Sequence, residues 1–364
     1  MKISKIELEN VKCFSKKVLS LEKEDTGEPL SVCALVGANG SGKSTILKAI
    51  VAAFYALNEN FAGALLEDDE ITLGGQMAKI DIDLRFAEQE RASLGLEEDY
   101  MQLEYRHCRD NDEEAREDAL YIPQYVFDNA IRTEAEVRDG MNEYIRLVSR
   151  LRASSQAGLI MYYDPFRFVS KKNPAGPNLQ MQEGPKTHAL ACNIDAEGSN
   201  LYRDVELKQW VVNMDYLRLK EPSERNQEIY KHIIKAFELL LHPLKFETIN
   251  QNGSLVFIDE KNNQQITIDM LSDGFKSIFS IVLDIIKRLA LAQDYENKEF
   301  YEKEAVILID EIDCHIHPKW QKKLMPAFRQ LFPNCQFIIT THSPYILDTL
   351  QEYEIRKVGE KEIL

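Results

Sequence analysis

The stretch VCALVGANGSGKSTILKAI, Val32–Ile50, decides how this chain folds. Five apolar residues at its start have the length of a buried strand, and Ile46, Leu47 and Ile50 have helical spacing. Between them lies the glycine-rich segment GANGSGKST. This order of strand, glycine loop and helix is the context that the pattern GxxxxGK[ST] requires. The stretch therefore predicts a loop that binds a nucleoside triphosphate.

The residue types in the loop explain why it suits phosphate. Glycines let backbone N–H groups close around phosphate oxygens, and the helix N-terminus adds positive potential. We expect Lys43 to reach the outer phosphates and Ser44 to offer its hydroxyl to Mg²⁺. The alternative is a glycine turn with a chance lysine, and the flanking pattern argues against it. The expected binding residues are Gly37, Asn39, Gly40, Gly42, Lys43, Ser44 and Thr45.

Two carboxylates follow a second apolar segment, AVILI at Ala305–Ile309. Open α/β sheets bind ligands at the carboxyl ends of their strands, where Asp310 and Glu311 stand. Beside a phosphate loop, a carboxylate in this place holds Mg²⁺ through its water shell, and the next one orients or deprotonates the attacking water. We expect Asp310 to be the metal ligand and Glu311 the general base. A surface turn is the alternative.

Two further segments carry weaker signals. The predicted strand Gln336–Ile339 runs into TTHSP, where His342 could donate a hydrogen bond to a γ-phosphate and sense its loss. A lone histidine is more often structural. The segment LSDGFKS, Leu271–Ser277, opens a predicted helix whose first N–H groups suit either an N-cap or a phosphate. Taken alone, this segment is better interpreted as an ordinary capped helix.

The composition is that of a soluble globular protein. The chain has 364 residues, 44% of them hydrophobic, and no apolar run approaches the ~20 residues of a membrane span. The start has no apolar segment of signal-peptide type, and six cysteines without CxxC spacing fit reduced thiols, so we expect a cytoplasmic protein without a membrane partner. A formal charge of −16 argues against a uniformly basic nucleic-acid binder. A local basic groove stays open; the candidate pairs are Lys16–Lys17, Lys171–Lys172 and Lys322–Lys323.

Hydrophobic periodicity predicts the elements around these motifs. Paired strands are expected within 2–21, antiparallel strands at Asp81–Phe86 and Met101–His107, and the helix from Ser44 is expected to reach about Leu57. Two helices are expected within 203–241, interrupted near Pro222, followed by three short strands, the last at 266–268. The first part of the chain is therefore predicted to combine a parallel core with an antiparallel flank.

The middle of the chain is less regular. An acidic loop is expected at 111–118 and a modest helical arm at 134–152. The segment LIMYYDPFRF after Gly158 predicts a strand that ends near Asp164. Residues 170–199 have little periodicity and are expected to form a loop that moves or binds a partner.

The motifs together resemble the ABC-type ATPases related to SMC and Rad50. More narrowly, they resemble the bacterial AAA-type group that includes the OLD-family ATPase domains and the ATPase subunit of Septu anti-phage systems. The motifs are GANGSGKST at 37–45, LSDGFKS at 271–277, ILIDEID at 307–313 followed by HIHPKWQ, and TTHSP at 340–344. The resemblance implies an α/β ABC-ATPase head with a mixed parallel sheet, an antiparallel β flank and a helical lobe.

The resemblance also implies a domain plan and roles for single residues. One ATPase domain would fill 1–364, with an ATP-binding core lobe at 1–110 and 300–350, a helical arm and loop at 111–200, and a helical signature lobe at 201–299. Lys43 would bind phosphates, Ser44 and Asp310 Mg²⁺, and Glu311 would be the base. The remaining assignments are Ser272 and Gly274 in the ABC signature, Asp313 in the D-loop and His342 as the switch histidine.

The resemblance implies partners as well. In such ATPases the signature of one subunit closes over the nucleotide of the other, which implies a homodimer with two ATP molecules at its interface. The implied function is an ATPase whose nucleotide state regulates a separate effector, a nuclease, in anti-phage defence. The alternative is a RecF- or Rad50-like repair ATPase that clamps DNA, so DNA stays a possible ligand. A transporter subunit and a non-hydrolysing nucleotide sensor are further alternatives.

Some residues depart from the family pattern. Asp273 and Phe275 stand in the signature where transporters carry glycine and glutamine. The glutamine of the Q-loop is not placed, because Gln76 and Gln124 are both candidates. Cys314, His315 and His317 crowd behind Glu311, but zinc needs four ligands and no second Cys/His cluster is visible. The two histidines are therefore interpreted as packing residues of the D-loop.

Overall fold

Two five-stranded sheets organise the computed structural model, which describes residues 1–55, 68–96, 98–108, 119–121, 159–165, 174, 176–178, 204–291 and 299–359. The antiparallel sheet has the order β2-β1-β4-β5-β6 and the parallel sheet the order β13-β3-β12-β11-β7. The antiparallel strands are β1 (Lys2–Val11), β2 (Phe14–Ser20), β4 (Met77–Arg85), β5 (Tyr100–Cys108) and β6 (Ala119–Tyr121). The parallel strands are β3 (Val32–Val36), β7 (Leu159–Tyr163), β11 (Ala305–Ile309), β12 (Gln336–Thr340) and β13 (Ile355–Lys357).

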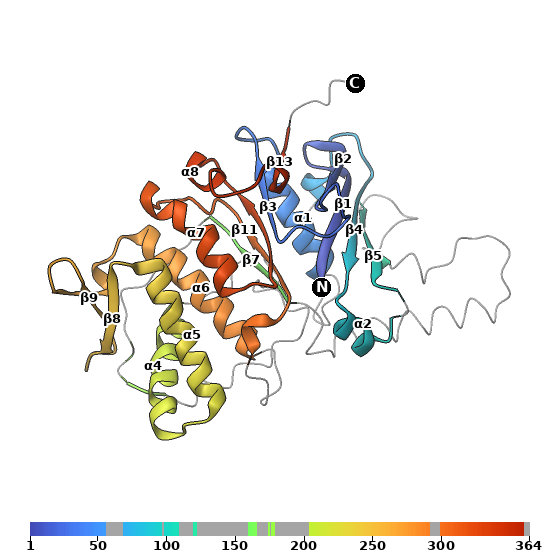
Figure 1. The fold of residues 1–364 in the computed structure, drawn as a ribbon. Coiled ribbons are helices and arrows are strands. Elements are labelled where there is room, and N and C mark those ends of the chain that lie inside the picture. The colour runs from blue at the N-terminus through green and yellow to red at the C-terminus, as the bar shows by residue number, and fades with distance from the viewer. Residues whose placement is uncertain are drawn as a thin grey trace.

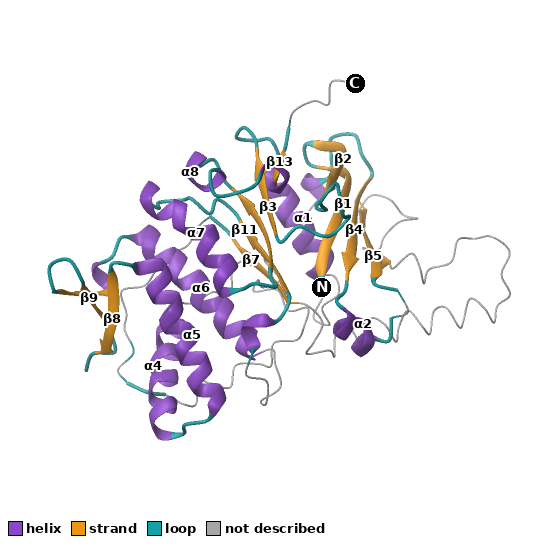
Figure 2. Cartoon of the chain, viewed as in Figure 1, coloured by secondary structure: helices purple, strands orange, loops and turns teal. Residues whose placement is uncertain are grey.

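Helices cover the parallel sheet on both faces (Figures 1 and 2). Helix α1 lies between the two sheets, and α4 to α7 pack on the opposite face. A small antiparallel sheet, β10-β9-β8, lies beyond those helices. The larger helices are α1 (Lys43–Tyr55), α4 (Asp204–Lys220), α5 (Glu224–Leu241), α6 (Asp273–Leu291) and α7 (Pro318–Leu331). The other elements are α2 (Glu88–Leu94), α8 (Pro344–Leu347), β8 (Leu244–Ile249), β9 (Leu255–Asp259) and β10 (Gln264–Thr267).

The two sheets follow from two sequence patterns. Strands β3 and β11 are continuous apolar runs, and β12 is apolar between Gln336 and Thr340, because a parallel sheet covered on both faces buries nearly every side chain. Alternate residues of these strands enter different cores: Leu308 joins the core with α1, whereas Ile307 and Ile309 join the core with α4 to α7. Strand β1 alternates instead, with Ile6 and Leu8 buried, because only one face of its sheet packs on α1.

One buried amide joins the two sheets. Gln336, at the start of β12, is fully buried. Its Nε2 donates to the carbonyl oxygens of Ile3 at 2.8 Å and Leu30 at 3.0 Å, and its Oε1 accepts from the N–H of Ile3 at 2.7 Å. A buried amide with these bonds is stable only where the strands keep this register. The amide therefore fixes the antiparallel sheet against the edge of the parallel one.

The predicted elements are largely confirmed. The hairpin at the N-terminus, the strands around 81–86 and 101–107, and the two helices within 203–241 are present. The last predicted short strand is shifted, since β10 ends at Thr267 and Ile268 begins a turn of 3-10 helix. Strand β7 lies within the expected arm and loop, 111–200, yet pairs with β11 and so completes the core sheet. The predicted features at 111–118 and 134–152 lie outside the described residues, as do Leu57 and nearly all of 170–199.

Candidate ATP site

The phosphate loop closes on itself. The Nζ of Lys43 is buried at the start of α1 and donates to the carbonyl oxygens of Gly37 and Ala38, both at 2.9 Å. Gly40 and Gly42 have φ angles of +77° and +96°, which side-chain-bearing residues rarely adopt. A Cβ on Gly42 would also lie 2.3 Å from the ring of Phe14. The glycines therefore let the loop curve under the turn between β1 and β2.

The loop fits a phosphate group chemically. The Oγ of Ser41 is buried and has no hydrogen-bond partner among the described residues. Ser44 and Thr45 stand half-buried in the first turn of α1, where helix N–H groups and the helix dipole favour an anion. A ligand with several acceptor oxygens would satisfy these donors and replace the two carbonyls at Lys43. These features suit a phosphate ligand, and the binding roles of the expected residues stay predictions.

The acid edge of the site lies across the sheet, at the ends of β11 and β12. Asp310 is 2% exposed, and the hydroxyl of Thr340 donates to its Oδ1. The same hydroxyl accepts the backbone N–H of Glu311 at 2.7 Å. One side chain of β12 therefore fixes both acidic residues that follow β11. Glu311 is exposed to solvent, and a general base that takes a proton from water needs such access.

The backbone at Glu311 is strained. Its φ angle is +47°, in the left-handed region that residues with a Cβ rarely occupy. Such angles persist only where surrounding contacts hold them, and they cluster at functional sites. Here the hydrogen bond to Thr340 and the bond from the N–H of Ile312 to the carbonyl of Thr340, at 3.1 Å, hold the turn.

A second network fixes the loop that contains His342. Asp313 accepts from the hydroxyl of Thr341 at 2.6 Å and from the backbone N–H of His342 at 3.4 Å. The buried Gln321 of α7 accepts from the hydroxyl of Ser343 and donates to the carbonyl of Ile316 at 2.7 Å. The backbone around His342 is held in this way while the residue itself is exposed. The sequence pointed to Asp313 and His342 but gave no sign of Gln321.

The signature residues lie against the D-loop of the same chain. Ser272 is exposed just before α6, and Gly274 is buried in its first turn. A Cβ on Gly274 would lie 2.1 Å from the carbonyl oxygen of His315 and 3.1 Å from the nitrogen of Ile316. Glycine is therefore required at position 274 for packing. Among the described contacts, those of Gly274 are with the D-loop of the same chain and not with its phosphate loop.

The neighbouring strand places a third acid at this edge. The backbone N–H of Asp310 donates to the carbonyl of Tyr163 at 2.8 Å, and Asp164 follows directly after β7. The sequence marked Asp164 only as the end of a strand, because the pairing of β7 with β11 is not visible in the chain order. Gln76 is exposed just before β4, and Gln124 lies outside the described residues.

The remaining expectations concern metals and membranes. Within the described ranges, no group of three or more His, Cys, Asp or Glu residues could hold a metal ion, and Cys314 forms no disulfide. Burial raises the pKa of the Cys33 and Cys335 thiols to about 12. No helix in the part of the chain that the structure describes is long and apolar enough to cross a bilayer.

Two family models match the chain. Residues 1–147 match the model described as "AAA ATPase domain". Residues 191–348 match the model described as "AAA domain, putative AbiEii toxin, Type IV TA system". The phosphate loop falls in the first match, and the signature, the acid edge and His342 fall in the second.

Curated relatives match the chain over different lengths. The chain is 26% identical over 392 residues to the "Retron Vc95 probable ATPase" of Vibrio cholerae serotype O1 biovar El Tor, covering 98% of this chain and 74% of that protein. It is 30% identical over 138 residues to the Septu protein PtuA of Bacillus thuringiensis, covering 36% of this chain and 34% of that protein. The name of the retron relative, together with the two family models, supports an ATP-hydrolysing enzyme.

The fold has a match among solved structures. An SMC head bound to the C-terminal winged-helix domain of ScpA aligns with a TM-score of 0.51 and 17% identity. The alignment covers 98% of this chain and 97% of that one. It supports the α/β ATPase-head architecture predicted from the sequence.

Proposed function

We propose a regulatory role for this chain, which is an ABC-type, SMC-like bacterial ATPase of the group that includes the Septu ATPases. Two copies bind two ATP molecules head to tail. The nucleotide state of this dimer switches a separate effector subunit, a nuclease, in anti-phage defence. The retron and Septu names of its relatives support the defence context.

The division of the site carries the proposal. Lys43 and Glu311 follow the carboxyl ends of two strands of the same parallel sheet. Ser272 is exposed just before α6, on the segment that packs against the D-loop. Gly274 packs on His315 rather than on the phosphate loop. A second copy is thus the natural source of the signature that would complete the nucleotide site.

Each residue of the site has a chemical task in this proposal. Lys43 exchanges its two carbonyl partners for phosphate oxygens, which a charged donor binds more strongly. Ser44 and Asp310 would hold Mg²⁺, which when bound neutralises phosphate charge. Glu311 takes the proton of the attacking water, and Thr340 keeps the backbone of Glu311 in place. His342 contacts the terminal phosphate.

A sizing experiment tests the dimer. With ATP and Mg²⁺, light scattering on a size-exclusion column should show the Glu311→Gln variant as a dimer, since slowed hydrolysis preserves the bound state. Adding Ser272→Arg should return it to a monomer that still binds ATP. The matched control is Ser15→Arg. Ser15 is also exposed but lies on β2, so this substitution should leave the dimer intact. An ATP-loaded Glu311→Gln monomer would contradict the head-to-tail arrangement.

A cleavage experiment tests the effector. The chain is purified with and without the protein encoded beside it, and DNA cleavage is measured with ATP, with ADP and without nucleotide. Cleavage should require the second protein and change with the nucleotide. Cleavage by the isolated chain would contradict a separate effector. ATP-dependent DNA binding by the isolated chain, with a steep salt dependence, would instead favour DNA clamping.

A further inference from the structure

The backbone that follows β13 touches the phosphate loop at its first residue. The N–H of Val358 donates to the carbonyl of Val36 at 2.8 Å, which continues the pairing of β13 with β3. A Cβ on Gly37 would lie 2.3 Å from the carbonyl oxygen of Val358. The start of the loop is therefore packed directly against the backbone of residue 358.

The next residue touches the middle of the loop. Gly359 has a φ angle of +88°, and a Cβ on it would lie 2.7 Å from the Cβ of Ser41 and 3.4 Å from its Cα. Both the angle and the space favour glycine at this position. Ser41 is the residue whose hydroxyl is buried without a partner among the described residues. The contact therefore covers the turn between Gly40 and Gly42.

We infer that Val358 and Gly359 are positioning residues for the phosphate loop. Their backbone forms a wall that supports the loop at Gly37 and Ser41 and so sets the direction of the N–H groups between them. A displacement of about 1 Å in such a site can weaken function by two orders of magnitude. The inference rests on the assignment of ATP to this loop.

The test is Gly359→Ala, measured by ATP affinity and steady-state kinetics. The added methyl should push Ser41 and weaken ATP binding about tenfold. KM should rise while kcat changes less than about twofold, since Glu311 and Thr340 are untouched. Gly74→Ala is the matched control: Gly74 also has a φ angle of +88°, but a Cβ there meets no atom within 4 Å. The control separates backbone strain from the contact with the loop.

A second substitution that restores ATP binding would show that the Gly359→Ala variant still folds. In Gly359→Ala combined with Ser41→Gly, the nearest contact of the methyl relaxes to ordinary van der Waals distances of 3.4 Å and more. The double variant should bind ATP as Ser41→Gly alone does. The inference is overturned if Gly359→Ala binds ATP like Gly74→Ala, or if the double variant shows no recovery. If Lys43→Ala still loses ATP in that case, the proposed function stands; if the wild type binds no ATP, both fail.

Discussion

The acid edge and the phosphate loop are built in opposite ways. At the acid edge, the Thr340 hydroxyl bonds both Asp310 and the backbone of Glu311, so neighbouring strands fix the geometry through side chains. The phosphate loop is held by the close approach of the Val358 backbone to Gly37 and by the hydrogen bonds of Lys43 to the loop itself. The acid edge is thus fixed in place without a ligand, whereas the phosphate loop has internal contacts that the proposed ligand must replace.

This contrast has a physical reason. A base must be held in place before water arrives, because reorganisation during the reaction would raise the barrier. A phosphate-binding loop needs N–H groups directed inward, and glycines with open backbone angles supply them without side chains. Lys43 satisfied by two carbonyls avoids an unpaired buried charge in the meantime.

The largest expected effect breaks the acid edge at its base. Glu311→Gln keeps the shape and removes the proton acceptor, so phosphate release should fall by about 10²–10⁴-fold while ATP binding remains. A phosphate-release assay measures hydrolysis, and an equilibrium titration measures ATP binding. Glu352→Gln, another exposed glutamate, is the control and should turn over normally. Undiminished release by Glu311→Gln would remove Glu311 as the base.

The next effect breaks the phosphate loop. Lys43→Ala should weaken ATP binding by about 10²-fold, the scale of one or two charge-assisted hydrogen bonds. The fold should persist, because the lysine bonds only its own loop among the described contacts. Isothermal titration with ATP tests this, with the exposed Lys48→Ala of the same helix as control. Equal affinities for the two variants would contradict the assignment.

A smaller effect sharpens the role of Thr340. Thr340→Val removes one donor to Asp310 and the acceptor of the Glu311 N–H, which should cost about 1–3 kcal/mol of unfolding free energy. Turnover should fall more than ATP affinity does. Thr340→Ser keeps the hydroxyl and should preserve both. Equal losses in the serine and valine variants would show that packing, not the hydrogen bonds, matters.

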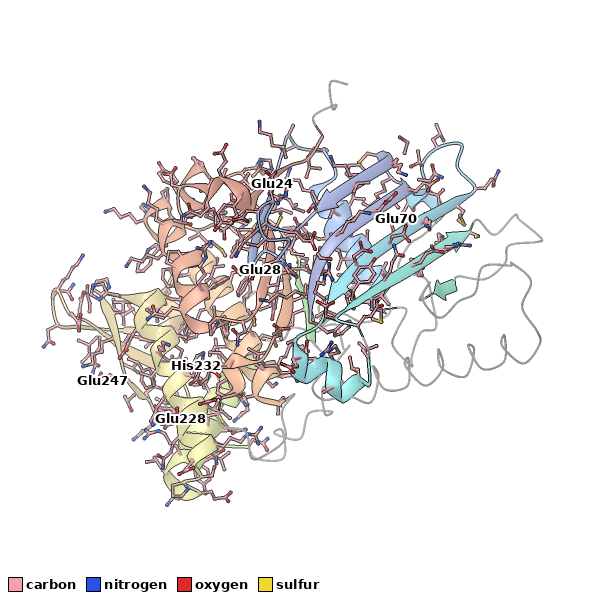
Figure 3. The ribbon with its side chains drawn as sticks, turned by 45° about the vertical axis from the view of Figure 1, so that its right-hand side comes forward. Glu24, Glu28, Glu70, Glu228, His232 and Glu247 are labelled. Carbon is pink, nitrogen blue, oxygen red and sulfur yellow. The ribbon has the colours of Figure 1, made fainter. Side chains whose placement is uncertain are left out.

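The smallest effect separates the fold from the site. His232 on α5, labelled in Figure 3, stacks on Tyr301 at 4.8 Å, and burial lowers its pKa to about 4. Nearby Lys235 also lowers the pKa, whereas Glu228 and a hydrogen bond with the Leu331 backbone raise it.

Because the folded pKa lies below the unfolded value of about 6.5, the unfolded chain binds more protons between these values. Stability is thus fully present above pH 6.5 and falls as the pH drops toward 4. Urea titrations should show a loss of about 2 kcal/mol from pH 7 to pH 5 that is attributable to this residue. His232→Gln should reduce the slope, and the exposed His242→Gln should not. An unchanged slope in His232→Gln would contradict the assignment.

Much of the fold could be predicted because its signals are local. The run from Val32 to Val36, the apolar β11 and the glycine loop each satisfy a pattern within a few residues. Lys43, Asp310 and Glu311 could be named because their chemistry follows directly after predicted strands. The contacts of these residues in the structure agree with the expected environment, although their catalytic roles stay predictions.

The other site features depend on distant pairs. Thr340 reaches Asp310 because β12 pairs with β11, and Gly359 reaches Ser41 because β13 pairs with β3. Neither pairing can be read from spacing along the chain. Gln321 resembles an ordinary helix residue until its contact with Ser343 is known. Side chains whose role is to support others thus leave little trace in a single sequence.

The left-handed angle at Glu311 sets the proposed role of this residue against the stability of the fold. A residue with a Cβ holds φ = +47° at a cost of about 1–2 kcal/mol, which a glycine would avoid. Under the proposed function, a change to glycine at this position would relieve the strain and would also remove the base that hydrolysis needs. A library screen for heat resistance should therefore enrich glycine at position 311, and the proposed role of Glu311 predicts that these variants do not hydrolyse ATP. The glutamate thus keeps a backbone angle that stability alone would not favour.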